Sequence, residues 1–116
     1  MGRNRVVVTG MGMVSPLGHN VAESWSAILA GKSGAAPIHR FDASAFATQF
    51  SASVKNLDLS PYLSDKEARK VDPFIQYGMA ASIQAVEDSR LLVTPENAER
   101  IGCVIGSGIG GLGSIE

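Results

Sequence analysis

A glycine-rich segment carries the clearest chemical pattern in the sequence. Residues 106–111 read Gly-Ser-Gly-Ile-Gly-Gly and formally match Gly-x-Gly-x-x-Gly, the pattern that cradles the pyrophosphate of a dinucleotide. Residues 10–15 resemble this pattern but lack the third glycine. Asp42 lies 30 residues after Gly12, whereas the acidic residue of the dinucleotide fingerprint lies about 20 residues further along the chain. The pattern predicts either a dinucleotide loop or a tight turn where two backbones approach closely.

A cysteine and two histidines provide the residue types of a thiol nucleophile with its bases. Cys103, however, lies within the apolar run Ile101–Gly106, where a cysteine behaves as a small hydrophobic side chain. An activated thiolate needs a nearby cation or a helix N-terminus. We therefore predict a structural role for Cys103, with no catalytic use of His19 or His39. One cysteine also excludes an internal disulfide and a multi-cysteine zinc site, so no metal is expected.

Three basic residues are spaced as neighbours on one face of a helix would be. If the segment is helical, Lys66, Arg69 and Lys70 fall at i, i+3 and i+4 and lie on one face. Such a face is either simply solvated or a docking patch for an acidic partner.

Length, composition and charge restrict the class of protein. The chain has 116 residues, enough for one domain, and its 45% hydrophobic residues can form a core. A net charge of -1 argues against nucleic-acid binding. The longest uncharged stretch, residues 6–22, is too short and too polar to span a membrane. A single cysteine fits a reducing compartment, so we predict a cytoplasmic location.

Strands are expected to alternate with helices. Val6–Val8 and Ile101–Gly106 have the character of buried strands in a parallel sheet. A helix is predicted between an Asn20 cap and Gly31, because Val21, Trp25, Ile28 and Leu29 fall on one helical face. Alternation of apolar and polar residues predicts a half-exposed strand over 50–54. The fold class is therefore α/β.

Two further helices are expected in the second half of the chain. Ser64 and Glu67 form a capping box for a short helix, and Asp72-Pro73 begins a long helix that extends to about Arg90. A strip of small residues on the long helix, Gly78, Ala81 and Ala85, would let a neighbouring backbone approach. Trp25 and Phe74 lie on helix faces and are interpreted as core residues. Because two strong strands are few for a parallel sheet, we expect a fragment of a larger protein.

Three segments together resemble a known family. Residues 6–18 read VVVTGMGMVSPLG, residues 74–78 read FIQYG and residues 105–111 read IGSGIGG. Their order and spacing resemble the β-ketoacyl-[acyl-carrier-protein] synthases, and among these the elongating synthase of bacterial type II systems. The resemblance covers essentially all 116 residues.

The resemblance implies a thiolase-like fold, a homodimer and an acyltransferase that elongates fatty acyl chains by decarboxylative Claisen condensation with malonyl-acyl carrier protein. Residues 1–116 would be its N-terminal portion, ending in or just after the glycine-rich loop. The catalytic cysteine and two histidines are expected beyond Glu116, so the chain alone is predicted to be inactive. No cofactor is implied, since the phosphopantetheine of the carrier protein holds the substrates.

The resemblance also implies two sites within these residues. Ile109, with Gly108 beside it, matches the residue that lines the acyl pocket and gates it. Lys66, Arg69 and Lys70 match basic positions that receive the acyl carrier protein. The alternatives are a non-catalytic homologue, such as a chain-length-factor partner, and a dinucleotide-binding domain.

Overall fold

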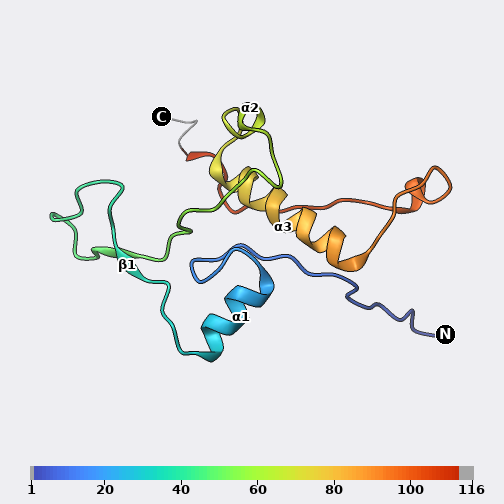
Figure 1. Cartoon of the computed structure of the whole chain (residues 1–116), viewed down its shortest axis with the longest axis horizontal. Helices are drawn as coiled ribbons and strands as arrows, with labels where there is room; N and C mark the ends of the chain where they lie inside the picture. Colours follow the sequence, from blue (N-terminus) through green and yellow to red (C-terminus); the bar gives the residue numbers. More distant parts are fainter. Residues whose placement is uncertain (1, 113–116) are drawn as a thin grey trace. The chain divides into compact units, whose positions relative to one another are not determined.

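The computed structural model, drawn in Figure 1, describes residues 2–112. These residues divide into two compact units. The middle unit is Met13–Asp58. The terminal unit joins the residues up to Gly12 with those from Leu59 onward. No helix among residues 2–112 is long and apolar enough to cross a membrane.

The middle unit contains the first predicted helix, α1, Val21–Leu29. The Asn20 side chain accepts a hydrogen bond from the Glu23 N–H at 2.9 Å, which satisfies one of the free donors at the helix start. Glu23 reaches back and accepts from the His19 N–H at 2.8 Å. After the helix, Gly31 has a φ of +65°, a conformation that glycine adopts without steric cost. The predicted helix and both of its ends are confirmed.

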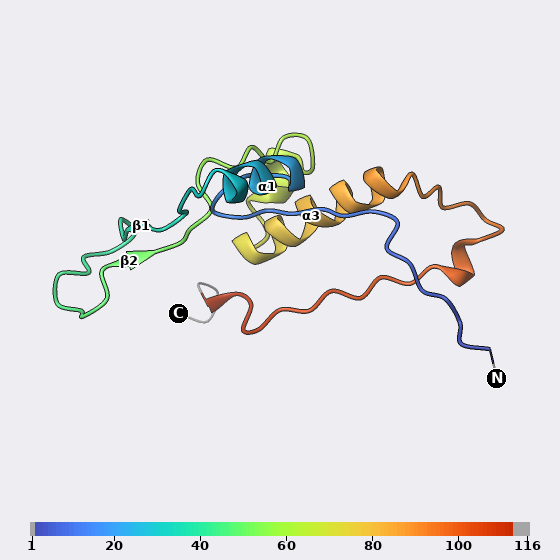
Figure 2. The same cartoon turned by 90° about the horizontal axis from the view of Figure 1, so that it is seen from below.

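A small antiparallel sheet completes the middle unit. Strand β1, Ala36–Pro37, pairs with β2, Phe50–Ser51, and Ala36 lies opposite Ser51 (Figure 2). The strand predicted over 50–54 is thus present only in its first two residues. Beyond Ser51, the described chain offers this strand no further partner.

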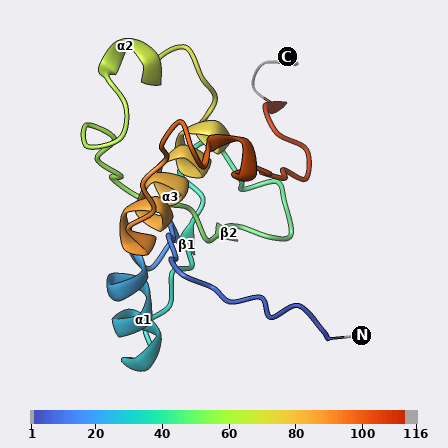
Figure 3. The ribbon, with the colours of Figure 1, turned by 90° about the vertical axis from the view of Figure 1, so that its right-hand side faces the viewer.

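The terminal unit contains the two other predicted helices. Helix α2, Asp65–Ala68, is a single turn closed by the Ser64–Glu67 capping box, and Figure 3 shows it joined by a loop to the longer helix. Helix α3, Pro73–Ser89, begins with Asp72 as its N-cap and ends at Arg90, whose φ of 55° is left-handed. A 3₁₀ turn, Ala98–Arg100, follows it. These helix predictions are confirmed.

The two predicted buried strands are absent from the described residues. Val6–Val8 and Ile101–Gly106 lie outside any strand, and Val6 and Val104 are 91% and 98% exposed. A strand in a parallel sheet needs hydrogen-bonding neighbours at its edges and cover on both faces. Within residues 2–112 the only sheet is that of β1 and β2, so neither requirement is met.

The predicted core residues are also more exposed than expected. Trp25 is 59% exposed and Phe74 is 39% exposed, while the buried apolar residues are Ala27, Ala43, Leu63 and Ala80. An amphipathic helix buries its apolar face only against another element, and these two aromatic side chains are only partly covered by the described residues.

The small-residue strip on α3 receives the N-terminal segment, as its composition predicts. The backbone at Gly10 and Gly12 comes so close to α3 that a Cβ at either residue would overlap the carbonyl oxygen of Ala85 or Ala81. The Met11 N–H also donates to the Asp88 carboxylate at 2.9 Å. Gly78 does not share this role, because a Cβ there would meet nothing within 4 Å.

Candidate functional site

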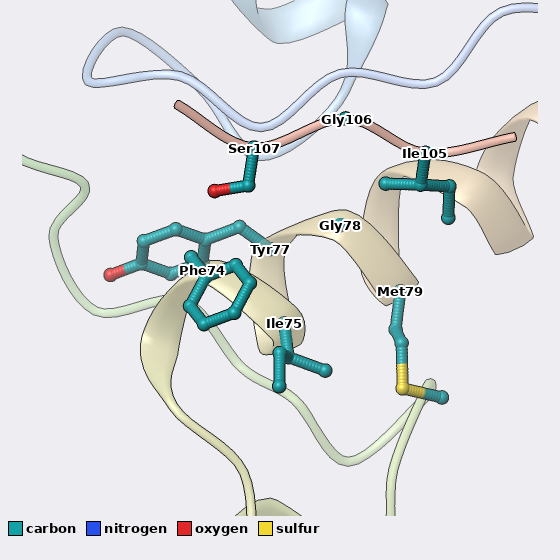
Figure 4. A pocket seen from close by; sticks show the side chains of 8 residues that line it. All are labelled: Phe74, Ile75, Tyr77, Gly78, Met79, Ile105, Gly106 and Ser107. Atoms are coloured by element: carbon teal, nitrogen blue, oxygen red, sulfur yellow. The ribbon is translucent and has the colours of Figure 1, made fainter. Parts of the chain in front are cut away.

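An apolar cavity lies in the terminal unit, beside the glycine-rich segment (Figure 4). Its volume is about 400 Å³. One wall is the segment Ile105–Ser107, and the other is the first part of α3, as Figure 4 shows. The residues that line it are Phe74, Ile75, Tyr77, Gly78, Met79, Ile105, Gly106 and Ser107. The walls are almost wholly apolar, which suits hydrocarbon rather than a charged ligand.

The end of the glycine-rich loop rests on the start of α3. A Cβ at Gly110 would lie 3.3 Å from Cζ of the Phe74 ring, and Gly110 has a φ of +80°. A Cβ at Gly111 would overlap Oδ2 of Asp72. Glycine adopts the positive φ of residue 110 without steric cost, and at residue 111 only glycine leaves room for the Asp72 side chain. A close approach in this loop was one of the two predicted alternatives, but the sequence did not predict that Phe74 and Asp72 would be the partners.

Ile109 and Gly108, the residues matched to the acyl gate, lie just before this contact. Ile109 is 76% exposed and is not among the residues that line the apolar cavity. A Cβ at Gly108 would meet nothing within 4 Å. The structure therefore places both residues on an open stretch of loop, and their substrate-binding role stays a prediction.

The three basic residues lie around the single turn of α2. Lys66 is within the helix, Arg69 is its C-cap and Lys70 follows, and all three are exposed. On the same turn, the pKa of Glu67 is lowered, mainly by the hydrogen bond from the Ser64 hydroxyl and to a smaller extent by the hydrogen bond from the Ser64 N–H. Helix α2 ends before Lys70, so the shared helical face of all three cations and their role as a docking patch both stay predictions.

Cys103 is exposed, not buried in a strand as predicted, because the described chain supplies no sheet around it. His19 belongs to the middle unit, where its Nε2 lies 2.7 Å from the Lys55 carbonyl oxygen. His39 is exposed in the same unit. Within residues 2–112 no three His, Cys, Asp or Glu side chains are grouped as a metal would require.

Comparison with known proteins identifies the family. Residues 3–116 match the family described as "Beta-ketoacyl synthase, N-terminal domain". The chain belongs to this family.

Two relatives are similar over the entire chain. The chain is 58% identical to "3-oxoacyl-[acyl-carrier-protein] synthase 2" of Vibrio harveyi and 60% identical to the protein of that name from Vibrio cholerae serotype O1 (strain ATCC 39315 / El Tor Inaba N16961). Both alignments cover all 116 residues of the chain and 28% of the relative. The chain therefore spans little more than a quarter of these relatives.

A solved structure shares the fold. "The ishigamide ketosynthase/chain length factor" superposes with a TM-score of 0.69 and 34% sequence identity, over 78% of this chain and 23% of that one. Family and fold thus agree with the ketosynthase resemblance, and the expected thiolase-like fold is supported at that level. The extended sheet of the α/β prediction is not formed within residues 2–112.

Proposed function

We propose that this chain works as the N-terminal part of a 3-oxoacyl-[acyl-carrier-protein] synthase that elongates fatty acyl chains. The observation that carries the proposal is the 58–60% identity to proteins of that name, maintained over the whole chain. The described residues are compatible with this role, because they supply exposed apolar side chains and three exposed cations, Lys66, Arg69 and Lys70.

The proposed reaction forms one carbon–carbon bond. An acyl group is first transferred from its carrier thiol to a cysteine thiol of the enzyme. Malonyl-carrier protein then loses carbon dioxide, and the enolate that remains attacks the acyl carbonyl. The cysteine thiolate leaves, and the product is a 3-oxoacyl thioester on the carrier protein. The cysteine and the two histidines that assist it are assigned to residues outside this chain.

Within the proposal, this chain contributes recognition. Ile109 and Gly108 border the acyl path, and Lys66, Arg69 and Lys70 receive the acidic carrier protein. Electrostatic complementarity of this kind accelerates docking more than it adds affinity. The proposal includes a homodimer in the cytoplasm, and no cofactor beyond the phosphopantetheine arm of the carrier protein.

A second candidate is a non-catalytic homologue, since the structural neighbour is titled as a ketosynthase/chain length factor. Identity to that neighbour is 34%, against 58–60% for the synthases. The enzyme is therefore the better-supported function.

The dinucleotide-binding alternative conflicts with the loop geometry. A pyrophosphate would have to approach the glycines of residues 106–111. The carboxylate of Asp72 lies against Gly111, the third glycine of the pattern. Two anions at one site would repel each other, so the loop is better explained by close backbone packing.

A hybrid enzyme tests the proposal. Residues 1–116 replace the matching segment of the Vibrio cholerae synthase, and we refer to the product as the hybrid protein. Incubated with acyl- and malonyl-carrier protein, it should release carbon dioxide and form a 3-oxoacyl-carrier protein that mass spectrometry detects. A folded hybrid protein that forms no condensation product would contradict the proposed enzyme and favour the non-catalytic homologue.

A further inference from the structure

We propose that Asp72 and Phe74 are positioning residues that hold the end of the glycine-rich loop and so restrict the movement of Ile109. The inference rests on the proposed function, because it assigns Ile109 a position beside the acyl path. It goes beyond that function by naming the residues that determine how easily the loop moves.

The held end of the loop is defined by close contacts. The Phe74 ring packs against Gly110, and Asp72 Oδ2 lies where a side chain of residue 111 would be. The Leu112 N–H donates to the Gly110 carbonyl at 3.0 Å, which tightens the turn at this point. A loop end with such contacts is expected to open rarely.

Asp72 is itself held by α3 and by the residues before it. Its carbonyl oxygen accepts from the N–H groups of Ile75 at 2.9 Å and Gln76 at 3.2 Å. The Gln76 side chain donates to the carbonyl oxygens of Ala68, at 2.8 Å, and Val71, at 3.2 Å. The Asp72 side chain makes no cap hydrogen bond to its own helix. This support makes the start of α3 a rigid base for the loop.

Two glycines in the preceding part of the loop, Gly106 and Gly108, lack such close contacts with the described residues. A Cβ at Gly106 or Gly108 would meet nothing within 4 Å, and Ile109 is exposed between Gly108 and the held Gly110. Movement of Ile109 is therefore expected to arise by rotation at Gly106 and Gly108, against the fixed end at Gly110. Weakening that end should free Ile109.

Two variants of the hybrid protein test the inference. Phe74→Leu removes the ring that packs on Gly110, and Gly111→Ala forces the loop away from Asp72. Tyr77→Leu is the matched control, because it removes an aromatic ring from the same cavity without being one of the nearest contacts of Gly110 or Gly111. Amide hydrogen exchange of residues 106–112 reports loop opening, whether or not the protein is active.

Exchange of residues 106–112 should become about fivefold faster in both loop variants and stay unchanged in Tyr77→Leu, since a modest loss of contact changes an opening equilibrium by that factor. Acylation by octanoyl-carrier protein should rise relative to acetyl-carrier protein. If Phe74→Leu unfolds α3, Gly111→Ala decides, because it leaves the helix sequence intact.

Unchanged exchange in Gly111→Ala, or equal effects in Phe74→Leu and Tyr77→Leu, would overturn the inference. Faster exchange with an unchanged octanoyl-to-acetyl ratio would overturn the control of Ile109. If the unaltered hybrid protein is acylated by neither substrate, the proposed function fails, and the exchange data alone then decide whether Asp72 and Phe74 hold the loop.

Discussion

The backbone of Gly12 lies directly on Ala81 of α3, so close that a Cβ at residue 12 would overlap the Ala81 carbonyl oxygen. Gly10 makes the equivalent approach to Ala85. Gly10 and Gly12 are two residues apart, which is about 6.6 Å along an extended chain, and Ala81 and Ala85 are four residues apart, which is about 6 Å along a helix. The spacing of the two glycines therefore matches the spacing of the two alanines. The glycines of the first loop thus serve helix packing.

Gly12→Ala should destabilise the hybrid protein by about 1–3 kcal/mol, because an added methyl group must displace the segment from α3. Gly2→Ala is the matched control, since a Cβ at Gly2 would meet nothing within 4 Å and Gly2 precedes the predicted strand segments. Urea unfolding of both variants measures the difference. Equal midpoints would contradict the close packing of Gly12 on the helix.

The turn of α2 should depend on pH through Glu67. Hydrogen bonds from Ser64 hold the pKa of this carboxylate below its ordinary value of 4.5. A lowered pKa means that its stabilising contribution is present above pH 4.5 and is lost as the pH falls through the folded-state pKa. The protection of the α2 amides from hydrogen exchange, which is the intrinsic exchange rate divided by the observed rate at the same pH, should therefore fall at the acid end of this range.

Glu67→Gln is the control for this pH dependence. Glutamine can still accept the hydrogen bond of a capping box, but it does not titrate. The loss of protection at α2 in acid should disappear in this variant, and an unchanged pH profile of protection would assign the effect to another group.

Charge reversal of the basic residues should impair use of the carrier protein. With Lys66, Arg69 and Lys70 all replaced by Glu, kcat/KM for carrier-protein thioesters should fall. The fall should correspond to a loss of transition-state stabilisation of a few kcal/mol at most, since each exposed ion pair is worth about 0.2–1 kcal/mol. The loss should shrink as salt screens the charges. Pantetheine thioesters, which lack an acidic protein, should react nearly as before.

Arg100→Glu is the control for this charge reversal, because it changes another exposed cation of the terminal unit. It should leave both substrate classes nearly unaffected. Equal losses with carrier-protein and pantetheine substrates would indicate a folding defect, and no loss with either would leave the three residues as a solvated face.

Ile109→Trp should slow acylation of the hybrid protein by long acyl chains far more than by acetyl. The larger side chain narrows the path that a long chain needs, whereas acetyl needs little of it. Stopped acylation reactions analysed by mass spectrometry give both rates. Equal slowing of the two substrates would make Ile109 a structural residue and not a gate.

Local sequence patterns were sufficient to predict the helices. The Asn20 cap of α1, the Ser64–Glu67 capping box of α2 and the Asp72-Pro73 start of α3 each involve residues three or fewer positions apart. The cap hydrogen bonds of Asn20 and Ser64 form as soon as the turn forms, and the proline at residue 73 has a backbone angle suited to the first helical position, so residue types predict these helix starts directly.

Contacts between distant residues needed the tertiary structure. Val6–Val8 and Ile101–Gly106 have the composition of strands, but a strand exists only where a neighbour accepts and donates its hydrogen bonds, and residues 2–112 supply none there. The glycine patterns indicated that another part of the chain approaches the glycine backbone closely, but they did not indicate which residues approach it. Only the folded chain decided that Gly12 meets Ala81 and that Gly111 meets Asp72, because these pairs are separated by tens of residues and no local pattern encodes the pairing.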